Sequence, residues 1–260
     1  MKNRLPQGNI MKKVLSIALI NTALLSTAAM SAEIHVGEMK ERAVLAAQAK
    51  ADAGDADGQF ALGGLYYQGI VTKQDYAKAR YWFEKAANKG HDKAQFNLGY
   101  MYYDGRGIAK DPAKAFYWFK KSAEEGDMKA QLYIADMYYN GYGTKQDYQE
   151  AFYWYKKTAD GGYPKAQHEV AKMYRAGLGT NKDMAKAKEY LSKASQQDCA
   201  DAQYDLGQMY LTGEGGVKNT EEAKSLMQNA YLNGKKDAKA VLDEHKWEEL
   251  PPFEIQQLPQ

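Results

Sequence analysis

The chain of 260 residues has one cysteine and four histidines, and both shortages limit the chemistry open to it. Cys199 alone cannot form a disulfide within the chain. The histidines, at 35, 91, 168 and 245, are far apart, and no His-Glu-x-x-His or Cys-x-x-Cys motif occurs. There is likewise no Gly-x-Ser-x-Gly motif. The sequence therefore predicts no metal site, no cofactor and no catalytic centre.

A strong net charge is also lacking. The formal charge is +2, but residues 1–32 carry Lys2, Arg4, Lys12 and Lys13 and no acidic residue. Without them the chain has 31 basic and 33 acidic residues. The basic character thus belongs to the leader, and the charge balance gives no reason to expect a nucleic-acid partner.

No apolar run is long enough to be a clear membrane span. Residues 1–32 have a basic start, an apolar stretch over residues 14–25 and a run of small residues before Ala32. This order predicts a secretory signal peptide, cleaved after Ser31 or Ala32, and export to a bacterial periplasm or beyond. The alternative is an uncleaved anchor over residues 14–30, but polar residues interrupt it and a span needs about 20 apolar residues. Met11 is a second candidate start.

What the sequence does contain is a 36-residue period. Five gap-free copies follow one another, at residues 55–90, 91–126, 127–162, 163–198 and 199–234. The alignment superimposes three residue sets: Gln59, Gln95, Gln131, Gln167, Gln203; Tyr66, Tyr102, Tyr138, Tyr174, Tyr210; and Gly69, Gly105, Gly141, Gly177, Gly213. Such a period predicts a stacked-repeat array, in which each copy covers an apolar face of its neighbour.

Each copy reads as two helices. In copy two, residues 93–104 place Ala94, Leu98, Met101 and Tyr102 on one face, and the glycines that follow end the helix. A second helix starts after a capping residue and buries a face at i, i+3, i+4 and i+7. The predicted caps are Asp75, Asp111, Asp147, Asp183 and Asn219, and the predicted buried face of copy two is Ala115, Trp118, Phe119 and Ser122.

Half units are expected at both ends of the array. Residues 33–54 match the second helix of a copy whose first helix is missing. Residues 235–247 match the first helix of a sixth copy, with Ala238 and Leu242 in register. Residues 248–260, EELPPFEIQQLPQ, contain three prolines and are predicted to be an extended tail. That tail could lie in a groove or have no role.

The pattern resembles the Sel1-like repeat family, a relative of the tetratricopeptide repeat. It is carried by a small residue with Gln, then Leu-Gly, Met-Tyr, Gly-x-Gly, a capping Asp, Lys-Ala, Trp and a closing Lys-Ala-Ala with Gly. The resemblance implies an all-α, right-handed α-solenoid that acts as an adaptor or protein-binding scaffold, usually without catalysis. Some exported relatives are cysteine-paired and penicillin-binding, and this chain lacks those cysteine pairs.

We expect the functional residues at positions whose identity varies between copies and whose side chains lie on the same side of the array. By the resemblance, the first-helix side opposite the core lines a concave groove. The predicted partner-binding residues are Phe60, Tyr67, Phe96, Tyr100, Tyr103, Lys129, Asp136, Tyr139, Lys165, His168, Lys172 and Arg175, with Leu132 on the same side. The early copies are aromatic and the fourth is basic, which favours a protein or peptide partner with an acidic group near copy four.

Several alternatives stay open. The tyrosines could be packing residues, with Tyr81, Tyr117 and Tyr153 filling gaps between copies. Cys199, at a predicted helix start, could have a lowered thiol pKa or be a tolerated substitution. The preferred interpretation is a non-catalytic scaffold of the bacterial envelope. The alternatives are an enzyme acting on cell-wall material or β-lactams, a secreted host-interaction factor and an inhibitor that holds another protein inactive.

Overall fold

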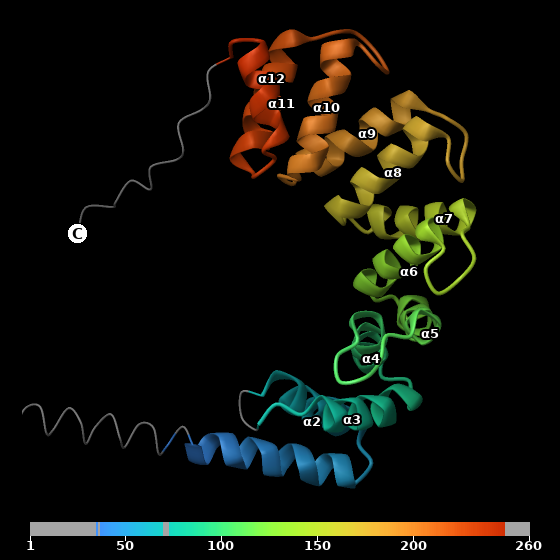
Figure 1. Cartoon of the computed structure of the whole chain (residues 1–260), viewed down its shortest axis with the longest axis vertical. Helices are drawn as coiled ribbons and strands as arrows, with labels where there is room; N and C mark the ends of the chain where they lie inside the picture. The colour runs from blue at the N-terminus through green and yellow to red at the C-terminus, as the bar shows by residue number, and fades with distance from the viewer. Residues whose placement is uncertain (1–34, 36, 70–72, 248–260) are drawn as a thin grey trace, which may run out of the picture. The chain divides into compact units, whose positions relative to one another are not determined.

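The structure is a computed structural model that describes residues 35, 37–69 and 73–247 (Figure 1). Every regular element within these ranges is an α-helix. A helix over residues 37–52 comes first. It is followed by α2 (Ala56–Gln68), α3 (Tyr76–Asn88), α4 (Asp92–Asp104), α5 (Pro112–Glu124), α6 (Met128–Asn140), α7 (Tyr148–Asp160), α8 (Pro164–Ala176), α9 (Met184–Ser195), α10 (Ala200–Thr212), α11 (Thr220–Leu232) and α12 (Asp237–Glu244). The all-α prediction is confirmed.

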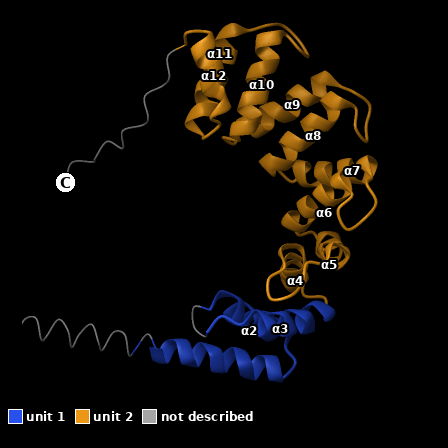
Figure 2. Ribbon diagram, in the orientation of Figure 1, with its two compact units in different colours: residues 1–89 blue, residues 90–260 orange. Residues whose placement is uncertain are grey.

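The predicted signal peptide and the proline-containing tail lie outside the described residues. The described residues divide into two compact units at the boundary between Lys89 and Gly90, and Figure 2 colours the two units separately. Unit 1 contains helix 37–52, α2 and α3; unit 2 contains α4–α12. Within unit 2 each helix packs against the next one in the chain, so that the unit is a series of helical hairpins.

Single residues determine where the helices begin and end. The side chains of Asp75, Asp111, Asp147, Asp183 and Asn219 each accept a backbone N–H in the first turn of their helix, as predicted. Each first helix from α2 to α10 ends at a glycine in the left-handed region, with φ between 66° and 80°. Pro112 at the start of α5 lacks an N–H where the helix needs none.

The second glycine of the turn between the two helices of a copy is required for a different reason. Gly179 has a φ of 67°, and a Cβ placed on it would lie 1.9 Å from the carbonyl oxygen of Tyr148. A Cβ on Gly143 would likewise lie 2.2 Å from the carbonyl oxygen of Pro112. The turn of one copy therefore lies directly on the start of the second helix of the preceding copy, and only glycine fits there.

The core contains the side chains that the periodicity predicts. Ala94, Leu98, Met101 and Tyr102 are buried on α4. The predicted face of α5 is buried as well, including Trp118 and Phe119. Tyr190 and Leu226, which replace tryptophan in copies four and five, are also buried. The alternative that Tyr81, Tyr117 and Tyr153 fill gaps between copies does not hold: each is at least 50% exposed, with its ring edge against the tryptophan that follows it.

Buried glutamines link neighbouring copies. Gln131 donates through Nε2 to the carbonyl of Ala123 in the preceding second helix, at 3.2 Å, and accepts from Thr158 Oγ1 in its own second helix. Gln167 and Gln203 repeat both contacts, with Gln197 and Asn233 as donors. Because an unpaired buried amide is destabilising, these bonds fix the register of the stack.

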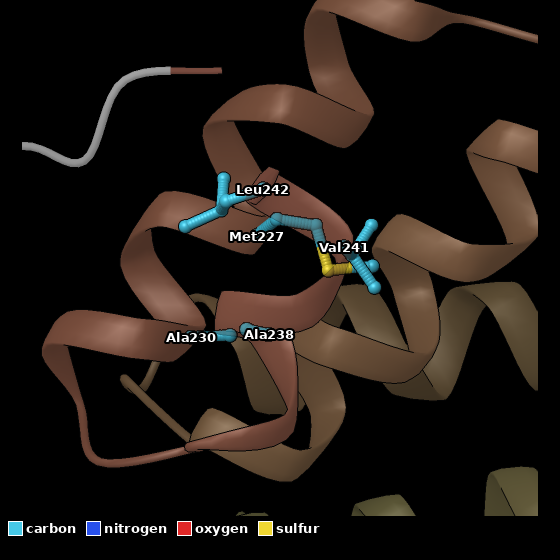
Figure 3. Close-up of a cluster of buried hydrophobic side chains, with 5 residues drawn as sticks. All are labelled: Met227, Ala230, Ala238, Val241 and Leu242. Carbon is cyan, nitrogen blue, oxygen red and sulfur yellow. The ribbon is translucent and has the colours of Figure 1, made fainter. Parts of the chain in front are cut away.

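Both ends of the helical series are covered. In unit 1, Ala47 and Ala51 of helix 37–52 pack on Leu62. In unit 2, Ala238, Val241 and Leu242 of α12 pack on Met227 and Ala230 of α11 (Figure 3). The outer residues of α12, including Asp243 and Glu244, are exposed.

Candidate functional site

The first helices of copies two and three bring together a dense group of rings. We define the aromatic cluster as Phe96, Tyr100 and Tyr103 of α4, Phe119 of α5, Tyr133 of α6 and Tyr142 after α6. The three α4 residues lie at i, i+4 and i+7, on the side of the helix opposite Ala94 and Leu98. All six residues belong to unit 2.

Tyr133 is the centre of this cluster. Its ring stacks on the fully buried Phe119, with centroids 4.7 Å apart. It also meets Phe96 at 5.8 Å and Tyr103 at 5.3 Å. Tyr103 meets Tyr142 edge to face at 5.5 Å. These offset and edge-to-face contacts hold the rings in fixed orientations, so that the surface they present is largely preorganised.

Sequence reasoning missed Tyr133 and Tyr142. Tyr133 comes 37 residues after Phe96, and Tyr142 comes 39 residues after Tyr103. Each separation exceeds the 36-residue period, because a side chain contacts the next copy one to three positions beyond its own equivalent. The ion pairs of the later copies have the same spacing, with His168 and Asp205 37 residues apart and Arg175 and Glu214 39 apart. Shifts of 37 and 39, applied to Phe96 and Tyr103, would have found Tyr133 and Tyr142.

The cluster combines apolar faces with available hydroxyl groups. Tyr100, Tyr103 and Tyr133 are half-buried, and Tyr142 is 37% exposed. Burial raises the pKa of Tyr103 and of Tyr133 above the ordinary tyrosine value, and nearby carboxylates add to the effect. Both hydroxyls therefore stay protonated at neutral pH. None of these four hydroxyls is hydrogen-bonded to another side chain or carbonyl in the ranges given above.

A cation already contacts the cluster. The guanidinium carbon of Arg106 lies 5.4 Å from the ring centroid of Tyr100, and its Nε donates to Asp104 at 2.6 Å. Arg106 and Asp104 are partly exposed and lie at the end of α4. The edge of the cluster is therefore polar, while its centre is aromatic.

Three of the four predicted basic side chains of copy four are paired with acidic groups, which corrects the expectation of a basic patch. His168 Nε2 lies 2.7 Å from Asp205, Lys172 donates to Glu169 at 2.8 Å, and Arg175 pairs with Glu214 at 2.9 Å. Asp205 and Glu214 lie about one period later in the chain, whereas Glu169 lies on the same helix as Lys172. Lys129 and Lys165 are exposed and have no ion-pair partner among the described residues.

Asp136 lies between the aromatic and the charged parts. It accepts a hydrogen bond from the hydroxyl of Tyr155. Burial raises the pKa of Asp136, although this bond and the nearby Lys165 oppose the shift. Burial, together with this carboxylate, strongly raises the pKa of Tyr155. Leu132, expected on the open side of α6, is buried instead.

The remaining predicted residues make local ring contacts. Tyr139 packs edge to face on Tyr148 at 5.2 Å. In unit 1, Phe60 and Tyr67 lie against Phe83, at 5.8 and 6.1 Å between centroids. The structure thus brings together three of the twelve predicted residues, Phe96, Tyr100 and Tyr103, in the aromatic cluster.

The described residues contain neither a membrane-spanning helix nor a cluster of metal ligands. In residues 35, 37–69 and 73–247 no helix has the length and apolar character that a membrane crossing requires. Over the same part of the chain, histidine, cysteine and acidic side chains nowhere gather in the groups of three that could hold a metal ion.

Paired helices with capped starts, glycine-ended turns and glutamine links define a helical-repeat protein. A model of the Sel1 repeat matches five successive segments, residues 56–91, 92–127, 129–163, 164–199 and 200–235. The chain belongs to the Sel1 repeat family. Proteins with these repeats generally mediate protein–protein interactions and are generally non-catalytic.

Solved bacterial structures share the fold. One is a protective antigen of uropathogenic Escherichia coli with an SLR fold, 30% identical, with a TM-score of 0.72 over 79% of this chain and 45% of that chain. Another is a Sel1 repeat protein from Oxalobacter formigenes, 29% identical, with a TM-score of 0.72 over 79% of this chain and 87% of that one. The chain thus spans less than half of the antigen. No curated protein matches it.

Proposed function

We propose that the protein is a non-catalytic scaffold of the bacterial cell envelope that binds a protein or peptide partner through the aromatic cluster. The observation that carries this proposal is the set of four tyrosines, Tyr100, Tyr103, Tyr133 and Tyr142, held by ring contacts and without hydroxyl partners among the described residues. Tyrosine is enriched in binding surfaces because it offers a large, rigid area and a polar group at low entropic cost.

The position of the cluster supports the same proposal. One α4 position of the cluster differs in every copy, because Tyr100 corresponds to Gly64, Asp136 and Lys172. The other two recur in part, Phe96 as Phe60 and Tyr103 as Tyr67 and Tyr139. Residues that hold the repeat together, such as Ala94 and Leu98, are buried on the other side of α4. A surface that varies on a regular support suits partner recognition. The envelope location rests on the signal-peptide pattern of residues 1–32.

Photo-crosslinking in the bacterium tests the binding surface. A photoreactive phenylalanine derivative in place of Tyr142 should give an adduct with a partner protein. The same derivative in place of Tyr153 is the control, because Tyr153 is 54% exposed but lies on α7, outside the cluster. Adding Tyr103→Ala should remove the adduct at position 142. An equal adduct at both positions, or none at either, would refute the proposed surface.

The non-catalytic part has its own test. The mature protein incubated with a fluorescent penicillin should show neither covalent labelling nor turnover. Labelling that survives denaturation would favour the β-lactam-active alternative and would require a nucleophile that the proposal does not include.

A further inference from the structure

We propose that a cavity in unit 1 binds a small zwitterion of the α-amino-acid class with an apolar side chain. The cavity has a volume of about 430 Å³, which is in the size range of small-molecule pockets. It is formed by the end of helix 37–52, α2 and α3, and it shares no residue with the aromatic cluster, so the inference goes beyond the proposed function. The lining residues that carry the argument are Asp52, Gln59, Tyr81, Trp82, Lys85 and Lys89.

A buried acceptor that lines this cavity has no donor within the described residues. Gln59 is 4% exposed, and its Nε2 donates to the carbonyl of Ala51 at 3.3 Å. Its Oε1 is also buried and has no hydrogen-bond partner in the part of the chain that the structure describes. Because a buried carbonyl oxygen without a donor is destabilising, the site favours a ligand that brings an N–H or O–H group.

Copies three to five supply this donor themselves. The Oε1 atoms of their equivalent glutamines accept from Thr158, Gln197 and Asn233. In copy one, Ala86 occupies the position of Thr158, and Lys89 occupies that of Gln197 and Asn233. The Nζ of Lys89 donates to a main-chain carbonyl instead. Copy one therefore lacks the internal donor that completes the glutamine link in the later copies.

Opposite charges line the cavity without pairing. Asp52 lies at the end of helix 37–52 and accepts a hydrogen bond from Gln48 at 2.8 Å. Lys85 lies in the last turn of α3, and Lys89 caps that helix. Within residues 35, 37–69 and 73–247, neither lysine forms an ion pair with Asp52 or with another carboxylate. Lys89 donates one N–H to the carbonyl of Gly54, which leaves it two more.

A zwitterion satisfies both kinds of group at once. Its ammonium can donate to the carboxylate of Asp52 and to Oε1 of Gln59. Its carboxylate can accept from Lys85 and Lys89, and hydrogen bonds between charged groups are the strong ones. A simple anion would leave Asp52 unpaired, and a simple cation would leave the lysines unpaired. An α-amino acid carries both charges close together, which suits a cavity of this size.

The aromatic side of the cavity suits an apolar side chain. Trp82 is half-buried and Tyr81 is 50% exposed, and their rings meet edge to face with centroids 5.0 Å apart. Trp82 also packs against the cluster of Ala47, Ala51 and Leu62, which holds its ring in place. A ligand side chain that covers these rings removes apolar surface from water.

Nuclear magnetic resonance titration of the full chain tests the site, with phenylalanine, leucine and methionine in their L and D forms as probes. At least one probe should shift the amide signals of Gly54, Lys85 and Lys89 and leave those of unit 2 unchanged. The N-acetyl derivative of that probe lacks the ammonium, and the amide of the same probe lacks the carboxylate. Each derivative should bind about tenfold more weakly or worse, because a charged hydrogen-bonding group is lost.

Variants of the lining test the same assignment. Lys89→Gln places the residue of position 197 in copy one, where it can donate to Gln59. This variant should bind the probe about tenfold more weakly and melt at no lower temperature than the parent. Asp52→Asn should also weaken binding, because it removes the charge that pairs with the ammonium. Lys121→Gln, an exposed change on α5 outside the cavity, is the matched control and should bind as the parent does.

Other outcomes overturn the inference. These are an absence of shifts with every probe, shifts that lie mainly in unit 2, derivatives that bind as tightly as the amino acid itself, or a Lys89→Gln variant that binds as well as the parent. None of these results bears on the photo-crosslinking at position 142, so the inference can fail while the proposed function stands.

Discussion

At the scale of single residues, Asp198 occupies a backbone position that glycine fills in other copies. Gly90, Gly126 and Gly162 have φ values of 87°, 103° and 90°, and Asp198 has a φ of 57°. A residue with a Cβ is strained in this region by about 1 kcal/mol, partly offset by the greater freedom of glycine in the unfolded chain. We expect Asp198→Gly to raise the free energy of unfolding by about 0.5 kcal/mol, measured by urea denaturation.

The reciprocal variant is the control. A Cβ on Gly162 would meet nothing within 4 Å, so Gly162→Asp changes backbone strain without a clash. By the same two opposing effects it should lower the free energy of unfolding by about 0.5 kcal/mol. If both variants shift stability in the same direction, backbone strain is not the cause.

Asp136 predicts a dependence of stability on pH. Burial raises its pKa in the folded state above the value of about 3.9 in the unfolded chain. The native state is therefore disfavoured relative to the unfolded state as pH rises through this interval, and the penalty is complete above the raised pKa. Asp136→Asn removes the charge and keeps an oxygen that accepts from Tyr155. The stability of the variant relative to the parent should thus be greater at pH 7 than at pH 3.5.

For Asp111→Asn we expect the opposite dependence of stability on pH. A hydrogen bond from the backbone N–H of Lys114 lowers the pKa of Asp111. This group contributes stability above its unfolded pKa and loses that contribution as pH falls. The asparagine variant should therefore lose stability relative to the parent as pH rises from 3.5 to 7. Thermal melts across this range check both variants, and parallel curves would contradict the assigned pKa directions.

The roles of some residues could be predicted from the sequence, and those of others could not. The caps Asp75 and Asp147 were predictable, because capping depends on the residue and its immediate neighbours. The pairing of Arg175 with Glu214 was not, because it joins different copies. Tyr133 was overlooked for the same reason: its contacts with Phe96 and Tyr103 also cross a copy boundary.

At the scale of helices, the glutamine links set how one copy lies on the next. Gln131 is 3% exposed and contacts both the preceding and its own second helix. Gln131→Leu leaves the Ala123 carbonyl and the Thr158 hydroxyl without this partner. We expect a loss of about 1–3 kcal/mol in the free energy of unfolding, measured by urea denaturation.

An exposed glutamine serves as the control for this link. Gln149 lies on α7 and its side chain has no hydrogen bond within the described residues. Gln149→Leu should change stability by less than about 0.5 kcal/mol. Equal losses in both variants would mean that the buried amide adds nothing beyond general helix effects.

Helices themselves were largely predictable from the sequence. Residues 93–104 were expected to be helical, and α4 covers Asp92–Asp104. The reason is that periodicity, caps and terminal glycines all act over a few residues. The close approach of Gly179 to Tyr148 was not predictable, because it depends on how one hairpin lies on another.

At the scale of the whole molecule, the repeat period determines the order of contacts. Packing in unit 2 connects each helix with its neighbours in the chain, as expected for a repeat array. The period also indicated that function belongs to the surface rather than to a reactive centre. Which copies carry the proposed surface depends on side chains that interrupt the regular pattern, such as Tyr100 and Tyr142. Tyr100 was among the predicted residues, and Tyr142 was not.

This arrangement predicts local rather than global responses to core substitutions in unit 2. Trp118 is buried on α5, and Trp118→Ala should destabilise its surroundings by about 3–5 kcal/mol. Because stability in a repeat array passes between nearest neighbours, amides of α4–α7 should exchange markedly faster with solvent than in the parent, and those of α10–α12 should change little. Tyr117→Ala, on the same helix but 51% exposed, should have little effect anywhere. Hydrogen-exchange mass spectrometry resolves these segments, and a uniform acceleration from α4 to α12 would instead mean that unit 2 unfolds as one cooperative block.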